Sequence, residues 1–215
     1  MKVRTQLGEG ALIVAGAIAA LAGWSGATPP GRTEAPPAAG GTKIDAATFG
    51  CIRSMTPVGR FYVGSVSGQV APVVAVAQSK SGGVFPRGAI VQLVPGEVMV
   101  KREPGFNAKT RDWEFFELDV SKAGTVIRKH GAGEIVNRFG GNCLSCHEKA
   151  EAKFDMICST DHGCDPIPLN LDMIRALQKT DPRCATNAEL TKAEKDALAL
   201  LLSISPPADK GGKPS

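Results

Sequence analysis

The 215-residue sequence lacks any run of basic residues, and its formal net charge is only +4. It also lacks a basic patch interleaved with aromatic residues, so we expect no nucleic-acid partner. The apolar stretch from Ala11 to Ala22 is shorter than the roughly 20 residues that a membrane-spanning helix needs. The remaining composition, 43% hydrophobic and 21% charged, is ordinary for a soluble protein and favours one main domain.

The N-terminal residues have the order of a secretory signal. Lys2 and Arg4 precede the apolar stretch, and the small residues Ser25-Gly26-Ala27 follow it. We therefore predict a signal peptide over 1–27 and a periplasmic or otherwise exported protein. The alternative is an uncleaved N-terminal anchor, in which case alone the protein would be attached to a membrane.

Two further segments contain little that could enter a core. Residues 28–43 are almost all Pro, Gly, Ala and Thr, which predicts a flexible linker. Residues 206–215 are rich in Pro, Gly and Lys, which predicts a disordered tail. Residues 44–205 are therefore the predicted folded domain.

Short β-prone runs separated by glycine and proline occupy the first half of this domain, and they predict antiparallel strands. Apolar and acidic residues partly alternate in the run from Trp113 to Val120, which predicts a sheet with one solvent-facing side. The expected strands are 61–63, 73–76, 89–94, 97–101, 114–120 and 125–128.

Helical patterns appear only in the second half. One covers Asp172 to Gln178, and another begins with a capping box from Thr191 to Glu194, followed by an apolar face. The predicted fold class is α+β, a mainly antiparallel β-sheet with flanking helices.

Cys143-Leu144-Ser145-Cys146-His147 is the attachment pattern of haem c, in which two thiols add to the vinyl groups and the adjacent imidazole binds iron. A thioredoxin-like dithiol would need a βαβ context, which is absent here. A four-cysteine zinc site would need a second close pair. We therefore predict one covalently bound haem c, with Cys143, Cys146 and His147 as cofactor-binding residues and His147 as the iron ligand.

Four cysteines remain, an even number that suits disulfides in an oxidising compartment: Cys51, Cys158, Cys164 and Cys184. Three connectivities are open. A local bond between Cys158 and Cys164 is favoured over metal binding, because no further ligands can be identified nearby.

The sixth iron ligand would decide the work of the haem, since a strong ligand favours electron transfer and an open position admits small molecules. None of the candidates stands out, because methionines commonly fill core gaps and a lone histidine is usually a surface or hydrogen-bonded residue. They are His130, His162, Met55, Met99, Met156 and Met173.

Three motifs in this order resemble the cytochrome P-460 family: Phe85-Pro86-Arg87-Gly88-Ala89, then Val98 to Lys101 leading to Trp113-Glu114-Phe115-Phe116, then the haem motif. The resemblance implies a mainly antiparallel sheet, commonly in a homodimer, with a five-coordinate haem c. Members of the family include hydroxylamine-oxidising enzymes and beta-type cytochromes c-prime, which bind nitric oxide.

The enzymes of that family carry a lysine cross-linked to the porphyrin, expected shortly after the Phe-Pro-x-Gly motif. Those positions read Ile90 to Leu93 here and contain no lysine, and Lys101 belongs to the later motif. The family's distal carboxylate has Glu134 as its nearest candidate, which a solvated surface charge explains equally well. The region from Cys158 to Cys184 lies outside the pattern.

The resulting hypothesis is a haem c protein that binds a small ligand such as nitric oxide, or exchanges electrons with a redox partner protein. The alternatives are a hydroxylamine-oxidising enzyme and a six-coordinate electron carrier. We expect an apolar pocket, with Phe85, Phe115 and Phe116 as the first aromatic residues to test, although burial in the sheet core explains them as well.

Overall fold

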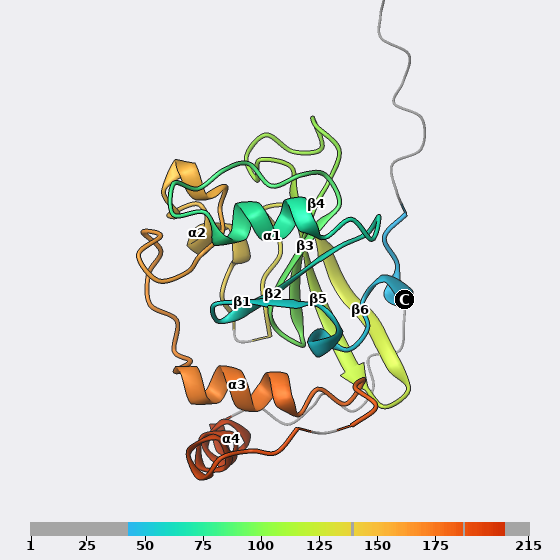
Figure 1. The fold of residues 1–215 in the computed structure, drawn as a ribbon, viewed down its shortest axis with the longest axis vertical. Helices are drawn as coiled ribbons and strands as arrows, with labels where there is room; N and C mark the ends of the chain where they lie inside the picture. The colour runs from blue at the N-terminus through green and yellow to red at the C-terminus, as the bar shows by residue number, and fades with distance from the viewer. Residues whose placement is uncertain (1–42, 139, 187, 205–215) are drawn as a thin grey trace, which may run out of the picture. The chain divides into compact units, whose positions relative to one another are not determined.

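The structure is a computed structural model, and it describes residues 43–138, 140–186 and 188–204 (Figure 1). The predicted signal peptide (1–27), the predicted linker up to residue 42 and the predicted tail (206–215) lie outside the described residues. Within these residues, none of the helices combines the length and the apolar character that crossing a membrane would need.

A six-stranded antiparallel sheet forms the centre of the fold, with the strands adjacent in chain order. Five of the six predicted strands are confirmed, the last of them extended at both ends. The first strand was not predicted. The strands are β1 (Thr56–Val58), β2 (Phe61–Ser65), β3 (Ala89–Val94), β4 (Glu97–Lys101), β5 (Trp113–Ser121) and β6 (Gly124–Gly131).

The prediction of a strand over 73–76 is wrong, because these residues belong to helix α1 (Ala71–Gln78). An apolar run of this length does not by itself distinguish a strand from a buried helix. Pro72 lies in the first helical turn, where its missing N–H needs no partner. Val73 is buried, and α1 crosses in front of the strands in Figure 1.

Both faces of the sheet are covered, so the predicted solvent-facing side is also wrong. Face A, defined by the cross-strand row of Val63, Val91, Met99 and Phe115, packs against α1. Face B holds a second buried cluster: Phe49, Ile90, Val98, Val100, Phe116 and Leu118.

Two acidic residues of β5, Glu114 and Glu117, are buried, and each has an arginine partner. Glu114 accepts from His130 Nδ1 at 2.7 Å and lies 3.3 Å from Arg102. Glu117 pairs with Arg128 and accepts from the Arg138 amide. Partners of this kind allow a carboxylate to lie in a core, which the alternation of β5 alone does not reveal.

The C-terminal helices are α3 (Leu171–Lys179) and α4 (Lys192–Ile204), which pack around Met173, Ala197 and Leu201. Both predicted helices are confirmed. The Gln178 amide joins α3 to the sheet by donating to the carbonyls of Arg60 and Leu93. The architecture is thus α+β, a six-stranded antiparallel sheet with a few helices.

Short helices complete the described chain. The three 3-10 helices are η1 (Ala46–Thr48), η2 (Ile52–Ser54) and η3 (Ala152–Phe154). The five-residue helix α2 (Cys143–His147) follows β6 and contains the predicted attachment motif. Residues 132–142 connect β6 to α2, and Cys143 and Leu144 pack against the face A cluster, which places the motif beside the sheet.

Candidate haem-attachment site

Helix α2 is held at its N-terminus by Asn142, whose side chain is the cap. Its Oδ1 accepts the Ser145 amide at 2.9 Å, and its Nδ2 donates to the Gly133 carbonyl at 2.8 Å. The Cys143 amide donates to the Ile135 carbonyl at 3.0 Å. The motif is therefore anchored to the segment that leaves β6.

Cys143 and Cys146 are the free cysteines among the described residues, and both are half-buried. Burial raises the pKa of Cys143 to about 11, with the negative charge of Glu97 adding to the effect. Burial also raises the pKa of Cys146. Both groups are consequently protonated thiols at neutral pH, three residues apart and at opposite ends of one helical turn.

The other four cysteines form two disulfides, Cys51–Cys184 and Cys158–Cys164. The prediction of a local Cys158–Cys164 bond is confirmed, and the connectivity that the sequence left open is decided. Within the described residues, the one group of three ligand-type side chains within 4.8 Å of one another is Cys51, Asp181 and Cys184. Two of its three ligand atoms are the bonded sulfurs, so this group does not indicate a metal site.

His147 is half-buried at the end of α2, and its ring centroid lies 5.4 Å from that of Phe115 on face A. Its Nδ1 lies 2.8 Å from the Met156 carbonyl oxygen. A carbonyl only accepts, so Nδ1 must carry the proton and Nε2 keeps its lone pair. Burial lowers the pKa of His147, against the opposing effect of this hydrogen bond. The neutral imidazole thus offers Nε2 as a metal ligand.

The candidate sixth ligands are scattered through the fold. Met55 packs on face B, Met173 belongs to the cluster between α3 and α4, and His130 stacks on Phe116 of face B with its Nδ1 on Glu114. None of these three belongs to the face A cluster that contains Cys143 and Leu144.

The other three candidates lie nearer to the motif. Met99 and Met156 are buried members of the face A cluster. The backbone carbonyl of Met156 is the one that bonds His147 Nδ1. His162 stacks on Phe154, with ring centroids 3.6 Å apart, and its Nδ1 lies 2.6 Å from the Ile157 carbonyl.

The three aromatic candidates divide between the two faces. Phe115 contacts His147, whereas Phe116, the next residue of β5, packs against Phe49 on face B. Phe85 packs edge-on against Trp113 and is buried. Of the three, the structure brings Phe115 to the motif, and it places Phe116 on the opposite side of the sheet.

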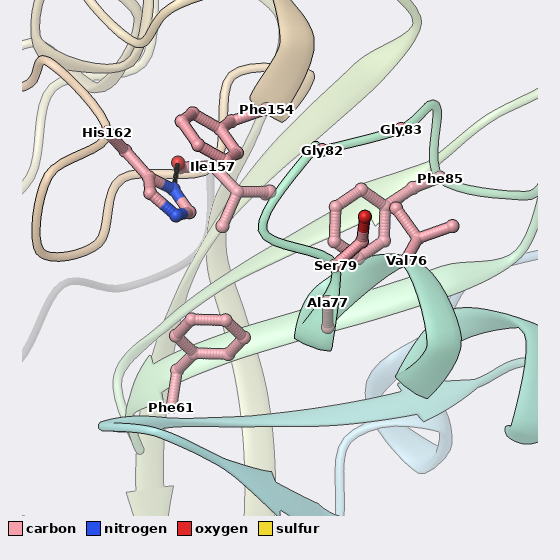
Figure 2. A pocket seen from close by; sticks show the side chains of 10 residues that line it. All are labelled: Phe61, Val76, Ala77, Ser79, Gly82, Gly83, Phe85, Phe154, Ile157 and His162. Atoms are coloured by element: carbon pink, nitrogen blue, oxygen red, sulfur yellow. Dashed lines mark hydrogen bonds between the residues drawn. The ribbon is translucent and has the colours of Figure 1, made fainter.

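Figure 2 shows the residues that line a small hollow, with His162 beside Phe154 and its hydrogen bond to Ile157. The hollow has room for about one water molecule, and neither motif cysteine lines it. It is therefore not the site of a macrocycle. Its lining consists of Phe61, Val76, Ala77, Ser79, Gly82, Gly83, Phe85, Phe154, Ile157 and His162.

Glu134 is exposed, and its carboxylate accepts the amide of Ala132 two residues away. A carboxylate that acts on the motif is instead that of Glu97 in β4, whose negative charge helps to raise the pKa of Cys143. Burial raises the pKa of Glu97 itself, partly opposed by a hydrogen bond from Asn137.

Three further residues at the site were not identified from the sequence: Lys101, Asp155 and Met156 through its carbonyl. Lys101 and Asp155 form a buried ion pair whose shortest contact is 2.7 Å. The signal for Lys101 was available, since Glu97 and Lys101 share one face of a strand with the apolar Met99. No local pattern marks Asp155, because its partner lies 54 residues away.

Comparison of the chain with protein-family models, with curated proteins and with solved structures gave no match. The class that the fold defines is an α+β protein with an antiparallel sheet. Any assignment of function therefore depends on the chemistry of the motif and its surroundings.

Proposed function

We propose that the protein carries one haem c, attached through Cys143 and Cys146, with Nε2 of His147 as an iron ligand. The observation that carries the proposal is the combination of two free thiols with an adjacent imidazole whose Nδ1 is already bonded. A metal-ligating histidine typically has its second ring nitrogen fixed in this way. The iron of such a group binds diatomic gases or exchanges electrons.

The donor geometry supports haem over zinc or another ion held by side chains alone. In the described part of the chain, Cys143, Cys146 and His147 do not form a group of converging ligand atoms. A zinc site would need four donors around one point. Covalent attachment would instead use the two sulfurs for thioether bonds and only the imidazole as an iron ligand.

The fold is compatible with the proposed relationship to the cytochrome P-460 family, whose expected antiparallel sheet it has. The disulfides support export to an oxidising compartment. In this proposal Phe115, whose cross-strand neighbour is Met99, supplies an apolar surface next to His147, which limits the access of water to the imidazole.

The positions of the candidate histidine and methionine ligands favour an iron whose sixth coordination position is open. Met55, Met173 and His130 pack in other parts of the fold, away from the face A cluster that contains Cys143. Binding of a small molecule such as nitric oxide is therefore favoured over six-coordinate electron transfer. Lys101 donates to Asp155 and to the Arg111 carbonyl, so its ammonium group is not free for a porphyrin cross-link. This weighs against hydroxylamine oxidation.

The test of attachment compares two double variants of the exported full-length protein. Cys143→Ala with Cys146→Ala should lose covalent haem on a haem-stained denaturing gel. Cys158→Ala with Cys164→Ala is the matched control, since it removes a nearby cysteine pair and should keep the stain. Haem that stays covalently bound without Cys143 and Cys146 would refute the proposal.

The test of the open site is the ferrous optical spectrum with and without carbon monoxide. We expect the gas to bind without displacing a side chain, giving a spectral change that is unaffected when His162 or Met99 is replaced. A low-spin ferrous spectrum that is insensitive to carbon monoxide, and that is lost in His162→Ala or Met99→Leu, would assign the protein to the electron carriers instead.

A further inference from the structure

The carbonyl that fixes His147 belongs to an unusual turn. Asp155 and Met156 both have left-handed backbone conformations, with φ of 48° and 67°. Residues other than glycine rarely adopt this conformation. Two such residues in succession persist only where the surrounding contacts hold them. The turn follows η3, and its geometry sets the direction of the Met156 carbonyl.

Asp155 is held at every polar atom of its side chain. Both carboxylate oxygens accept from Lys101 Nζ, at 2.9 and 2.7 Å, and Oδ2 also accepts the Phe85 amide at 2.9 Å. Its backbone carbonyl accepts Trp113 Nε1 at 2.8 Å. The side chains of Lys101 and Asp155 are only 7% and 4% exposed, so water does not compete for these contacts.

Lys101 is itself fixed from two directions. It is the last residue of β4 and pairs in register with Trp113 of β5. Its Nζ donates to the Arg111 carbonyl at 2.7 Å and lies 5.0 Å from the centroid of the Trp113 ring. A continuous set of contacts therefore runs from the sheet through Lys101 and Asp155 to the Met156 carbonyl and His147.

We propose that Lys101 and Asp155 are positioning residues for His147: their buried ion pair holds the turn whose carbonyl selects the Nδ1–H tautomer. This inference takes its importance for the iron from the proposed function. If the turn relaxed, the imidazole could place its proton on Nε2, and that tautomer cannot donate a lone pair to a metal from Nε2.

Stabilisation of the core alone is a weaker explanation for the Lys101–Asp155 ion pair than the positioning of His147. Well-packed apolar residues of similar volume often stabilise a core as well as a buried ion pair does. Here the ion pair lies one residue before the carbonyl that bonds His147, and it holds two residues in left-handed conformations. The position predicts an effect on the imidazole that a generic loss of stability would not produce.

The experiment compares Lys101→Met and Asp155→Asn with Asp181→Asn in the full-length holoprotein. Asp181→Asn is the matched control because Asp181 forms an ion pair of similar burial with Arg183, away from the motif. The first readout is the iron–histidine stretching band of the ferrous protein in resonance Raman spectra. We expect it to shift to lower frequency in both test variants and to stay unchanged in Asp181→Asn.

The second readout does not need haem. In the full-length Cys143→Ser/Cys146→Ser chain, ¹⁵N NMR should show His147 protonated at Nδ1, and Lys101→Met or Asp155→Asn should produce a mixture of tautomers. If Lys101→Met and Asp155→Asn gave the same Raman band and the same His147 tautomer as Asp181→Asn, the proposal would be overturned. Failure of haem attachment in the parent would instead count against the proposed function, because the NMR readout would still report on the turn.

Discussion

The sheet and the segment between β6 and α3 are organised by different interactions. Every strand pairs with its neighbour in the chain, and two apolar clusters cover the faces. Among its described residues, the later segment contains only α2 and η3 as regular elements. A disulfide, an N-cap and a buried ion pair determine its path. Cys143, Cys146 and His147 thus lie on a segment that has little hydrophobic core of its own. Polar contacts orient this segment on the sheet, which has a core on each face.

Removal of the long-range Cys51–Cys184 disulfide should have the largest effect on stability of the changes considered. Cys51→Ala with Cys184→Ala should lower the free energy of unfolding by about 5 kcal/mol, because the bond closes a loop of 133 residues in the unfolded chain. Urea unfolding followed by circular dichroism measures the change. A loss below about 2 kcal/mol would mean that the sheet and α3 hold together without it.

Truncation of the two aromatic residues of β5 sharpens the contrast between the faces. Phe115→Ala and Phe116→Ala should each cost about 3–5 kcal/mol of unfolding free energy, since both side chains are buried. Of the two variants, only Phe115→Ala should also alter the optical spectrum of the haem that we propose, because Phe115 and not Phe116 contacts His147. Equal spectral changes in the two variants would contradict the assignment of the site to face A.

The short disulfide should matter less. Cys158→Ala with Cys164→Ala should cost about 2 kcal/mol, because the loop that it closes is short, with a sequence separation of 6. Thermal unfolding of the two double variants under the same conditions compares the bonds directly. A larger effect here than for Cys51 and Cys184 would show that the site segment, rather than the long-range link, limits stability.

Removal of the N-terminal cap of α4, which lies away from the motif, should have a smaller effect on stability. Thr191 Oγ1 accepts the Glu194 amide at 3.2 Å, and Glu194 accepts the Thr191 amide at 2.7 Å. Thr191→Ala should cost about 1 kcal/mol and leave the haem spectrum unchanged. Thr191→Ser is the control that keeps the hydroxyl. A spectral change in Thr191→Ala would indicate coupling between α4 and the site.

The last prediction concerns reactivity and involves little change in stability. In the chain made without haem, alkylation of Cys143 should accelerate with pH up to about 11, because the thiolate reacts and the pKa of this thiol is raised. Glu97→Gln removes a neighbouring negative charge, so it should lower that pKa and speed alkylation a few-fold at pH 8. An alkylation midpoint near the ordinary thiol pKa would contradict the burial of Cys143.

Strand segments were predictable because alternation and turn residues act within a few positions of the chain, and five of the six predicted runs are strands. Helix α4 and its capping box were predictable for the same reason. The helix over 71–78 was not, because a short β-branched apolar run suits either conformation and packing on face A decides between them.

The sequence by itself determined the spacing of Cys143, Cys146 and His147 and the local Cys158–Cys164 bond, since both depend on neighbouring residues. The tertiary structure decided that Cys51 pairs with Cys184, that Phe115 rather than Phe116 faces His147, and that Lys101 meets Asp155. These three depend on contacts between segments far apart in the chain. The hydrogen bond from His147 Nδ1 to the Met156 carbonyl belongs with them, because it joins α2 to a turn whose Asp155 carbonyl is bonded by Trp113 of β5.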